Sequence, residues 1–138
     1  MQRVNVGIVG LGNVGMGTIA VLTENAKQIK EKLGFDLKIK SVCSRSVMTM
    51  TLPDGVKGVH KTNDWREVVK NPDVDIVAEL VGGTGVAKEI IEAAVKQRKS
   101  IVTANKELMA LAGAELWDTA IKVGINLAME ASVAGGIA

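Results

Sequence analysis

The segment VNVGIVGLGNVG, residues 4–15, decides the fold. Its first six residues are rich in β-branched side chains, as in a buried strand, and apolar residues at helical spacing follow the segment. Between the two, Gly10, Gly12 and Gly15 give the pattern G-x-G-x-x-G. The first glycine permits a tight turn, the second lets the backbone approach a pyrophosphate, and the third lets the helix pack closely on the strand. The segment therefore predicts the first strand, turn and helix of a dinucleotide-binding domain.

The phosphate-binding part of this turn is expected at Gly12, Asn13 and Val14. There the backbone N–H groups at the start of the helix, together with the positive end of its dipole, attract anionic groups. The alternative is a structural glycine turn in an α/β protein that binds no nucleotide. The position of the glycines, after a strand and at the start of a helix, favours the nucleotide.

Strands and helices alternate along the rest of the chain. After the first helix, which Gly34 ends, the residue patterns predict strands at 37–43, 74–81, 100–103 and 124–130, and helices at 64–70, from 86 to about 98, and at 106–122 with a break near Gly113. Residues 44–63 show no sustained period and are interpreted as a long loop with room for one short strand. This alternation predicts a Rossmann-type, doubly wound α/β fold: a mostly parallel sheet with helices on both faces, spanning residues 1–128.

Composition excludes several classes of protein. The net charge of +2 is too small to indicate binding to nucleic acid or to an acidic membrane surface. Cys43 is the single cysteine, which excludes an internal disulfide and a metal site made of paired thiols. No apolar run reaches the roughly 18 residues that a membrane span needs. The chain enters its first strand without the pattern of a signal peptide, so a cytoplasmic location is expected.

The end of the second strand bears on the choice between NADP and NAD. NAD-specific domains usually carry Asp or Glu there, which binds the ribose 2′-hydroxyl. Here the strand ends in Cys43-Ser44-Arg45-Ser46, and Asp36 precedes the strand. Because a guanidinium matches a phosphate group well, Arg45 favours the 2′-phosphate of NADP. The alternative is that Arg45 is a solvated surface residue and that NAD is the cofactor.

Two further segments lie where ligands bind in open α/β sheets, beyond the carboxyl ends of strands. Gly82 and Gly83 follow the third predicted strand, where glycine lets the backbone lie against a cofactor, although a simple turn would look the same. Lys106 follows the fourth, at a helix start, where the helix dipole disfavours a positive charge. Because this unfavourable charge lies at the edge where ligands bind, it suggests that Lys106 has a functional role. The alternative is an ordinary exposed lysine.

Four segments together resemble the nucleotide-binding half of homoserine dehydrogenases. They are GLGNVG (10–15), ELVGG (79–83), TANK (103–106) and EASVAGGI (130–137). The resemblance implies an enzyme that interconverts L-aspartate 4-semialdehyde and L-homoserine by hydride transfer with NADPH or NADH, on the route to threonine, isoleucine and methionine. It also implies that Lys106 lies beside the nicotinamide and the substrate and takes part in catalysis.

The resemblance further implies a sodium site, formed by Glu130 and the carbonyl groups of Val133, Gly135 and Ile137. On this basis residues 129–138 are the start of a catalytic and dimerisation domain whose remainder, with a second lysine that donates the proton, lies outside this sequence. The family usually has Pro where Ala138 stands. We therefore expect a full-length homo-oligomeric enzyme but an inactive fragment.

Two other interpretations stay open. Oxidoreductases of the glucose–fructose oxidoreductase type also place a lysine after a late strand, typically within Glu-Lys-Pro, whereas here the triplet is Asn105-Lys106-Glu107. A nucleotide-sensing regulatory domain without catalysis would need the glycines but would not need Lys106 or the segment that begins at Glu130.

Overall fold

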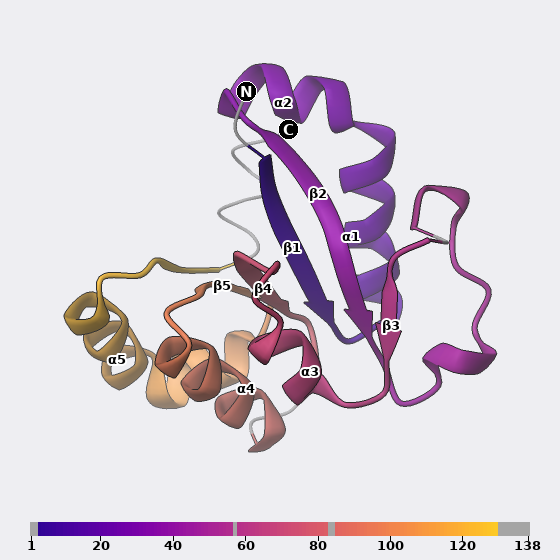
Figure 1. Ribbon diagram of the computed structural model, residues 1–138. Coiled ribbons are helices and arrows are strands. Elements are labelled where there is room, and N and C mark those ends of the chain that lie inside the picture. The colour runs from indigo at the N-terminus through magenta and orange to yellow at the C-terminus, as the bar shows by residue number, and fades with distance from the viewer. Residues whose placement is uncertain (1–2, 57, 83–84, 130–138) are drawn as a thin grey trace.

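The computed structural model describes residues 3–56, 58–82 and 85–129, and its centre is a six-stranded sheet (Figure 1). The strand order is β3-β2-β1-β4-β5-β6, and each neighbouring pair is parallel. This is the doubly wound order that the sequence predicts. The strands are β1 (Arg3–Val9), β2 (Asp36–Cys43), β3 (His60–Thr62), β4 (Ile76–Glu79), β5 (Ser100–Thr103) and β6 (Leu127–Met129).

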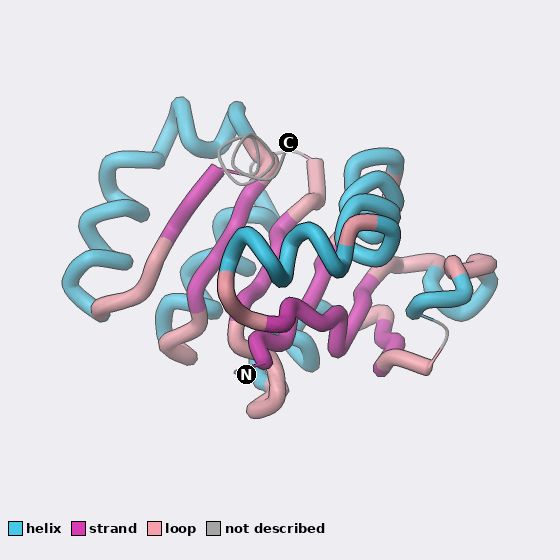
Figure 2. Tube along the Cα trace, turned by 90° about the horizontal axis from the view of Figure 1, so that it is seen from above, coloured by secondary structure: helices cyan, strands magenta, loops and turns pink. Residues whose placement is uncertain are grey.

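Helices connect the strands, and they pack on both faces of the sheet, as predicted. Figure 2 shows their alternation with the strands from above. The α-helices are α1 (Asn13–Glu24), α2 (Ala26–Leu33), α3 (Trp65–Lys70), α4 (Gly85–Lys96) and α5 (Lys106–Val123), and two short 3₁₀ helices occupy Val47–Thr49 and Asp54–Val56.

The sheet separates two aliphatic cores. Alternate strand residues point to opposite faces. Helices α3, α4 and α5 cover one face, where Val77, Ile101 and Leu127 are buried. Helix α1 and the residues between β2 and β3 cover the other face, where Ile8 and Val42 are completely buried. Aliphatic side chains therefore fill both cores, as the scarcity of aromatic residues requires.

Several element boundaries differ from the sequence prediction. The first helix is divided, because Asn25 leaves the helical conformation (φ −112°, ψ 22°) between α1 and α2. The expected strand at 74–81 is paired only over Ile76–Glu79. A short strand, β3, does form within the predicted loop and extends the sheet beyond β2. These changes leave the predicted topology intact.

The prediction was wrong at two glycines of the C-terminal half. Helix α5 continues through Gly113, which is buried on the face that packs on the core, so tertiary packing offsets the low helix propensity of glycine. Gly124 does not begin a strand: it ends α5 in the left-handed conformation (φ 86°), and its N–H donates to the carbonyl of Ala120. The last strand therefore begins only at Leu127.

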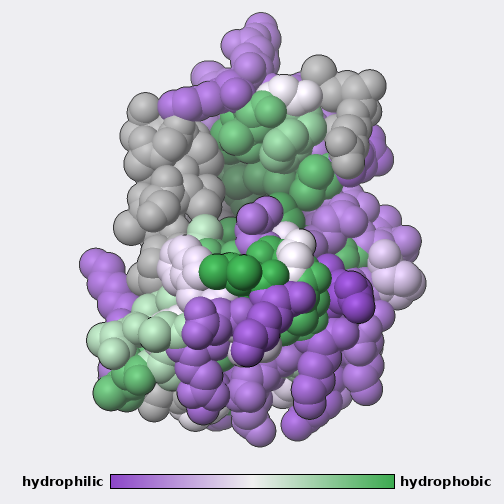
Figure 3. Space-filling view, turned by 90° about the vertical axis from the view of Figure 1, so that its left-hand side faces the viewer, coloured by the Kyte–Doolittle hydropathy of each residue, from purple (hydrophilic) through white to green (hydrophobic). Residues whose placement is uncertain are grey.

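Helix α5 also carries apolar side chains on its outer surface. Leu111 is 73% exposed, Ile121 is 65% exposed and Trp117 is 45% exposed. Figure 3 views the molecule from the side on which α5 lies and shows apolar surface in green between hydrophilic side chains in purple. Only some of the apolar residues of α5 therefore pack against the sheet, and these residues define the inner face of the helix. Across the part of the chain that the structure describes, no helix has the length and apolar character needed to cross a membrane.

Candidate functional site

The glycine turn between β1 and α1 has the geometry that the sequence predicts. Gly10 has φ +105°, and a Cβ atom there would lie 2.8 Å from the carbonyl carbon and oxygen of Leu80. A Cβ atom on Gly15 would collide with the carbonyl oxygen of Gly10. Gly12 is different, since nothing lies within 4 Å of its Cβ position. Gly10 and Gly15 are therefore required by the fold itself, whereas Gly12 borders open space.

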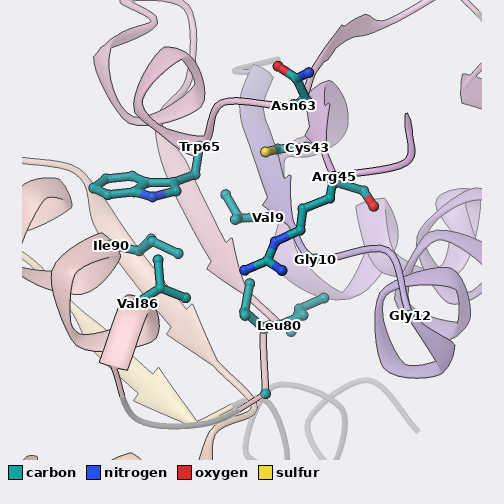
Figure 4. Close-up of a pocket in the computed structure, with 13 residues that line it drawn as sticks. Val9, Gly10, Gly12, Cys43, Arg45, Asn63, Trp65, Leu80, Val86 and Ile90 are labelled. Atoms are coloured by element: carbon teal, nitrogen blue, oxygen red, sulfur yellow. The ribbon is translucent and has the colours of Figure 1, made fainter. Parts of the chain in front are cut away.

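A cavity of about 460 Å³ opens beside this turn (Figure 4). It lies at the carboxyl ends of β1, β2, β3 and β4. In the sheet, β2 is the neighbour of β1 on one side and β4 is its neighbour on the other. This is the place where open α/β sheets bind ligands. Its walls are formed by Val9, Gly10, Gly12, Cys43, Ser44, Arg45, Asn63, Trp65, Leu80, Val81, Gly82, Val86 and Ile90.

Arg45 supplies positive charge to this cavity. Its side chain extends from the end of β2 toward Gly10 and Leu80 (Figure 4), so it is not simply directed into solvent. Ser44 and Ser46 flank it, with their hydroxyl oxygens 3.5 Å apart. None of the described residues that line the cavity is Asp or Glu. The arrangement is suited to an anionic group near the end of β2.

Asn63 and Trp65 also line the cavity, although the sequence analysis assigned them no role. Both follow β3, whose three residues gave no recognisable strand pattern. The indole of Trp65 forms one wall together with Val86 and Ile90 of α4 (Figure 4). Its other contacts include the guanidinium of Arg66, 4.6 Å from the ring centroid. The cavity thus has an apolar wall opposite the glycine turn.

Cys43 also lines the cavity and is buried. Burial, together with the nearby carboxylates of Asp64 and Glu67, raises the pKa of its thiol to about 11. The thiol is therefore protonated at neutral pH and is a poor nucleophile. Among the residues that the structure describes, no cluster of His, Cys, Asp and Glu could hold a metal ion.

Lys106 stands at the same edge of the sheet but outside the cavity wall. It is the first residue of α5 and is exposed. Asn105 caps the helix, since its side-chain oxygen accepts a hydrogen bond from the N–H of Leu108 at 2.9 Å. Because β5 is the neighbour of β4, Lys106 lies beyond the β4 side of the cavity. The described residues thus bring the glycine turn, Arg45 and Gly82 together, with Lys106 at the same edge.

A buried carboxyl group lies between the cavity and Lys106. Glu79, the last residue of β4, is completely buried and accepts hydrogen bonds from Thr103 and from the N–H of Val81. Burial raises the pKa of the Glu79 carboxyl, while these two hydrogen bonds act in the opposite direction. The sequence analysis quoted this residue within a motif but gave it no role. Its position at the end of an apolar strand was the available signal.

A serine, a histidine and a glutamate lie in line at the β3 edge. The hydroxyl oxygen of Ser41 is 2.8 Å from Nδ1 of His60, and Nε2 of His60 is 3.7 Å from a carboxylate oxygen of Glu67. Ser41 is completely buried, so its hydroxyl cannot reach a substrate. His60 itself is exposed. The cluster is therefore not a nucleophilic triad.

Five predicted site residues lie outside the described residues: Gly83, Glu130, Val133, Gly135 and Ile137. The suggested sodium site and the second glycine of the Gly82–Gly83 pair consequently stay predictions.

Comparison with known proteins agrees with this arrangement. Residues 10–130 match the family model described as homoserine dehydrogenase, NAD binding domain. The chain is 42% identical to the homoserine dehydrogenase of Neisseria gonorrhoeae and 36% identical to that of Bacillus subtilis. Each match covers 99% of this chain but only 31% of the relative.

Solved structures give the same result. The crystal structure of S. aureus homoserine dehydrogenase at pH 8.5 superposes with a TM-score of 0.85 at 34% identity, covering 96% of this chain and 33% of that one. The homoserine dehydrogenase of Thiobacillus denitrificans gives 0.85 at 35% identity, covering 94% and 30%. The chain thus spans about a third of the length of the relatives it matches. It belongs to the NAD-binding domain family of homoserine dehydrogenases.

Proposed function

We propose that this chain binds NADP, or NAD, as the nucleotide-binding part of an oxidoreductase that interconverts L-aspartate 4-semialdehyde and L-homoserine. The observation that carries the proposal is the cavity at the carboxyl edge of the sheet, bordered by the glycine turn at the start of α1. A pocket of this kind, at the point where the strand order reverses, is where α/β sheets bind dinucleotides.

The start of α1 fits a pyrophosphate. Gly12 occupies the capping position and provides no side-chain acceptor, and the first turn contains no acidic residue. The N–H groups at the start of the helix therefore keep their capacity to bind an anion, and the dipole favours it. The open space at Gly12 is the space that a phosphate needs. We place the pyrophosphate over Gly12, Asn13 and Val14.

The two halves of the dinucleotide then extend to opposite sides of β1. On the β2 side, Arg45 would bind a 2′-phosphate, which favours NADP over NAD. The apolar wall of Trp65, Val86 and Ile90, opposite the glycine turn, fits a purine ring. On the β4 side, Gly82 and Gly83 would let the backbone lie against the nicotinamide half. Lys106 follows β5 at the same edge.

The chemistry proposed for Lys106 depends on charge. The nicotinamide supplies or accepts the hydride when it is bound. The ammonium group of Lys106 would stabilise the negative charge that develops on the aldehyde oxygen, or help to deliver a proton to it. A substrate must also be held close to the cofactor, and the chain spans about a third of its relatives. We therefore infer that this chain alone binds nucleotide but does not turn over substrate.

The remaining features belong to a longer enzyme. We propose that residues 1–128 form the nucleotide-binding domain and that 129–138 begin a catalytic and dimerisation domain, with Glu130 and the carbonyls of Val133, Gly135 and Ile137 at a sodium site. The enzyme would be a cytoplasmic homo-oligomer that serves threonine, isoleucine and methionine synthesis. A nucleotide-sensing domain would use the same cavity, but it gives no reason for a lysine at position 106.

The replacement Gly12→Val tests the proposed placement. The valine side chain would occupy the space assigned to the pyrophosphate, so we expect loss of nucleotide binding without loss of the fold. Gly17→Val is the matched control, because Gly17 lies on α1 and its Cβ position is also open. Both variants are titrated with NADPH, and folding is monitored by circular dichroism. Unchanged affinity in a folded Gly12→Val variant would show that the pyrophosphate lies elsewhere.

A further inference from the structure

Four residues at the ends of β4 and β5 form a closed ring of hydrogen bonds. The hydroxyl of Thr103 donates to Oε1 of Glu79 at 2.6 Å, and the N–H of Val81 donates to Oε2 at 2.8 Å. The N–H of Asn105 donates to Oγ1 of Thr103 at 3.0 Å, and its side-chain amide donates to the carbonyl of Val81 at 3.3 Å. The ring therefore joins the segment that follows β4 to the segment that follows β5.

The direction of each hydrogen bond within this ring follows from which atoms can donate and which can accept. Thr103 has one hydroxyl hydrogen, and its oxygen already accepts from Asn105, so that hydrogen is directed at Glu79. The Glu79 carboxyl thus faces two donors, which an ionised carboxylate accepts best. Glu79 and Thr103 are completely buried, and Asn105 is 8% exposed. Hydrogen bonds in such surroundings fix orientation strongly, because a broken one leaves a buried polar atom without a partner.

The ring connects two parts of the proposed site. Val81 and Gly82 belong to the cavity wall on the β4 side. Asn105 caps α5, whose first residue is Lys106. The carbonyl of Glu79 also accepts the N–H of Ala104 at 3.2 Å, so the main chain of Glu79 holds the same connection. The start of α5 is therefore attached to the cavity wall through Glu79 and Thr103.

We propose that Glu79 is a positioning residue: through Thr103 and Asn105 it fixes Lys106 relative to the nicotinamide end of the nucleotide cavity. This inference rests on the proposed nucleotide binding. Glu79 does not touch the reacting atoms itself. Its buried carboxylate holds two strand ends in one geometry, so that a nucleotide resting on Val81 and Gly82 is placed relative to the amine of Lys106.

The test follows the Lys106 side chain directly. In the ¹³C-labelled chain, the Lys106 ε-carbon signal is assigned with Lys106→Arg and monitored by NMR as ligand is added. NADPH is expected to shift this signal, whereas adenosine 2′,5′-bisphosphate, which lacks the nicotinamide, is not. Nucleotide affinity is measured in the same titrations. If the wild-type chain binds neither ligand, the proposed function fails; if it binds NADPH without a Lys106 shift, only the positioning inference fails.

Variants then separate positioning from general stability. In Glu79→Gln only the amide oxygen can accept a hydrogen bond, so the donor that faces the amide nitrogen, Val81 or Thr103, loses its acceptor. We therefore expect the NADPH-induced Lys106 shift to fall by about half or more while NADPH affinity changes less than about threefold. Thr103→Val should behave alike, and Thr103→Ser, which keeps the hydroxyl, should restore the shift. The comparison of Thr103→Val with Thr103→Ser still tests the inference if Glu79→Gln does not fold.

The matched control is Glu67→Gln. Glu67 also accepts a threonine hydroxyl, from Thr62 at 2.7 Å, but it lies at the β3 edge and does not line the nucleotide cavity. Its replacement should leave the Lys106 shift at the wild-type value. A full Lys106 shift in Glu79→Gln or Thr103→Val, or an equal reduction in Glu67→Gln, would overturn the inference.

Discussion

Replacing Arg45 by Ala should weaken NADPH binding about tenfold while leaving NADH binding within about twofold. The guanidinium of Arg45 extends into the nucleotide cavity from the end of β2, with no Asp or Glu among the described lining residues to compete for it. A hydrogen bond to a charged group contributes about 1.5–3 kcal/mol. Because Arg45 is an exposed residue, solvent screening places the expected loss at the lower end, and about 1.4 kcal/mol corresponds to tenfold in Kd.

The assay is a titration of the wild-type chain and of Arg45→Ala with both nucleotides at about 0.1 M salt, where exposed charges are screened over about 10 Å. Arg3→Ala is the control for a general change in charge, because Arg3 lies at the amino end of β1 and pairs with Asp36. Tighter binding of NADH than of NADPH by the wild-type chain would refute the assignment. An equal loss for both nucleotides in Arg45→Ala would refute the 2′-phosphate contact.

Three further predictions concern turnover by this chain, Lys106 and Glu79. The 138-residue chain with NADPH and aspartate semialdehyde should show no nicotinamide oxidation. In a full-length enzyme, Lys106→Ala should lower kcat at least about 100-fold, with nucleotide affinity largely kept. Near-normal turnover in either experiment would contradict the corresponding prediction. Because burial raises the pKa of Glu79 above its ordinary value of 4.5, the folded chain binds more protons than the unfolded chain just above that pH. The free energy of unfolding of the wild type, relative to that of Glu79→Gln, should therefore fall as the pH rises from 4.5. Urea titrations of both proteins across this pH range measure the difference. A difference that rises with pH would contradict the prediction.

The fold was predictable because its signals are local. Gly10, Gly12 and Gly15 are within six residues of one another, and their roles follow from one turn. Gly34, in the left-handed conformation with φ 81°, ends α2 where the sequence predicts a helix end. By contrast, Gly113 has the same intrinsic preference against helix but lies in a packed face of α5. Local preference decided the first cases, and tertiary contacts decided the last.

The residues to which the sequence analysis gave no role come together only through strand pairing. Glu79 and Thr103 are aligned partners in the β4–β5 register, although they are 24 residues apart in the chain. Nothing local identifies such a pair, but both residues end their strands, and polar residues at the ends of neighbouring parallel strands meet at one edge. Trp65 was missed because β3 is only three residues long, too short for a residue pattern to reveal.

Under the proposed function, the strand order also predicts the direction in which the dinucleotide would lie. Arg45 follows β2 and Lys106 follows β5, while the glycine turn follows β1, which stands between them in the sheet. At the usual strand spacing, β2 and β5 are roughly 14 Å apart, which calls for an extended ligand with its charged centre near the middle. A dinucleotide with its pyrophosphate on the turn has that form. If the 2′-phosphate lies at Arg45, as we propose, the nicotinamide would lie toward β4 and β5. Under the proposed function, Arg45 would therefore bind the adenosine end of the cofactor, and Lys106 would stand near the nicotinamide end, where the reacting carbonyl group would lie.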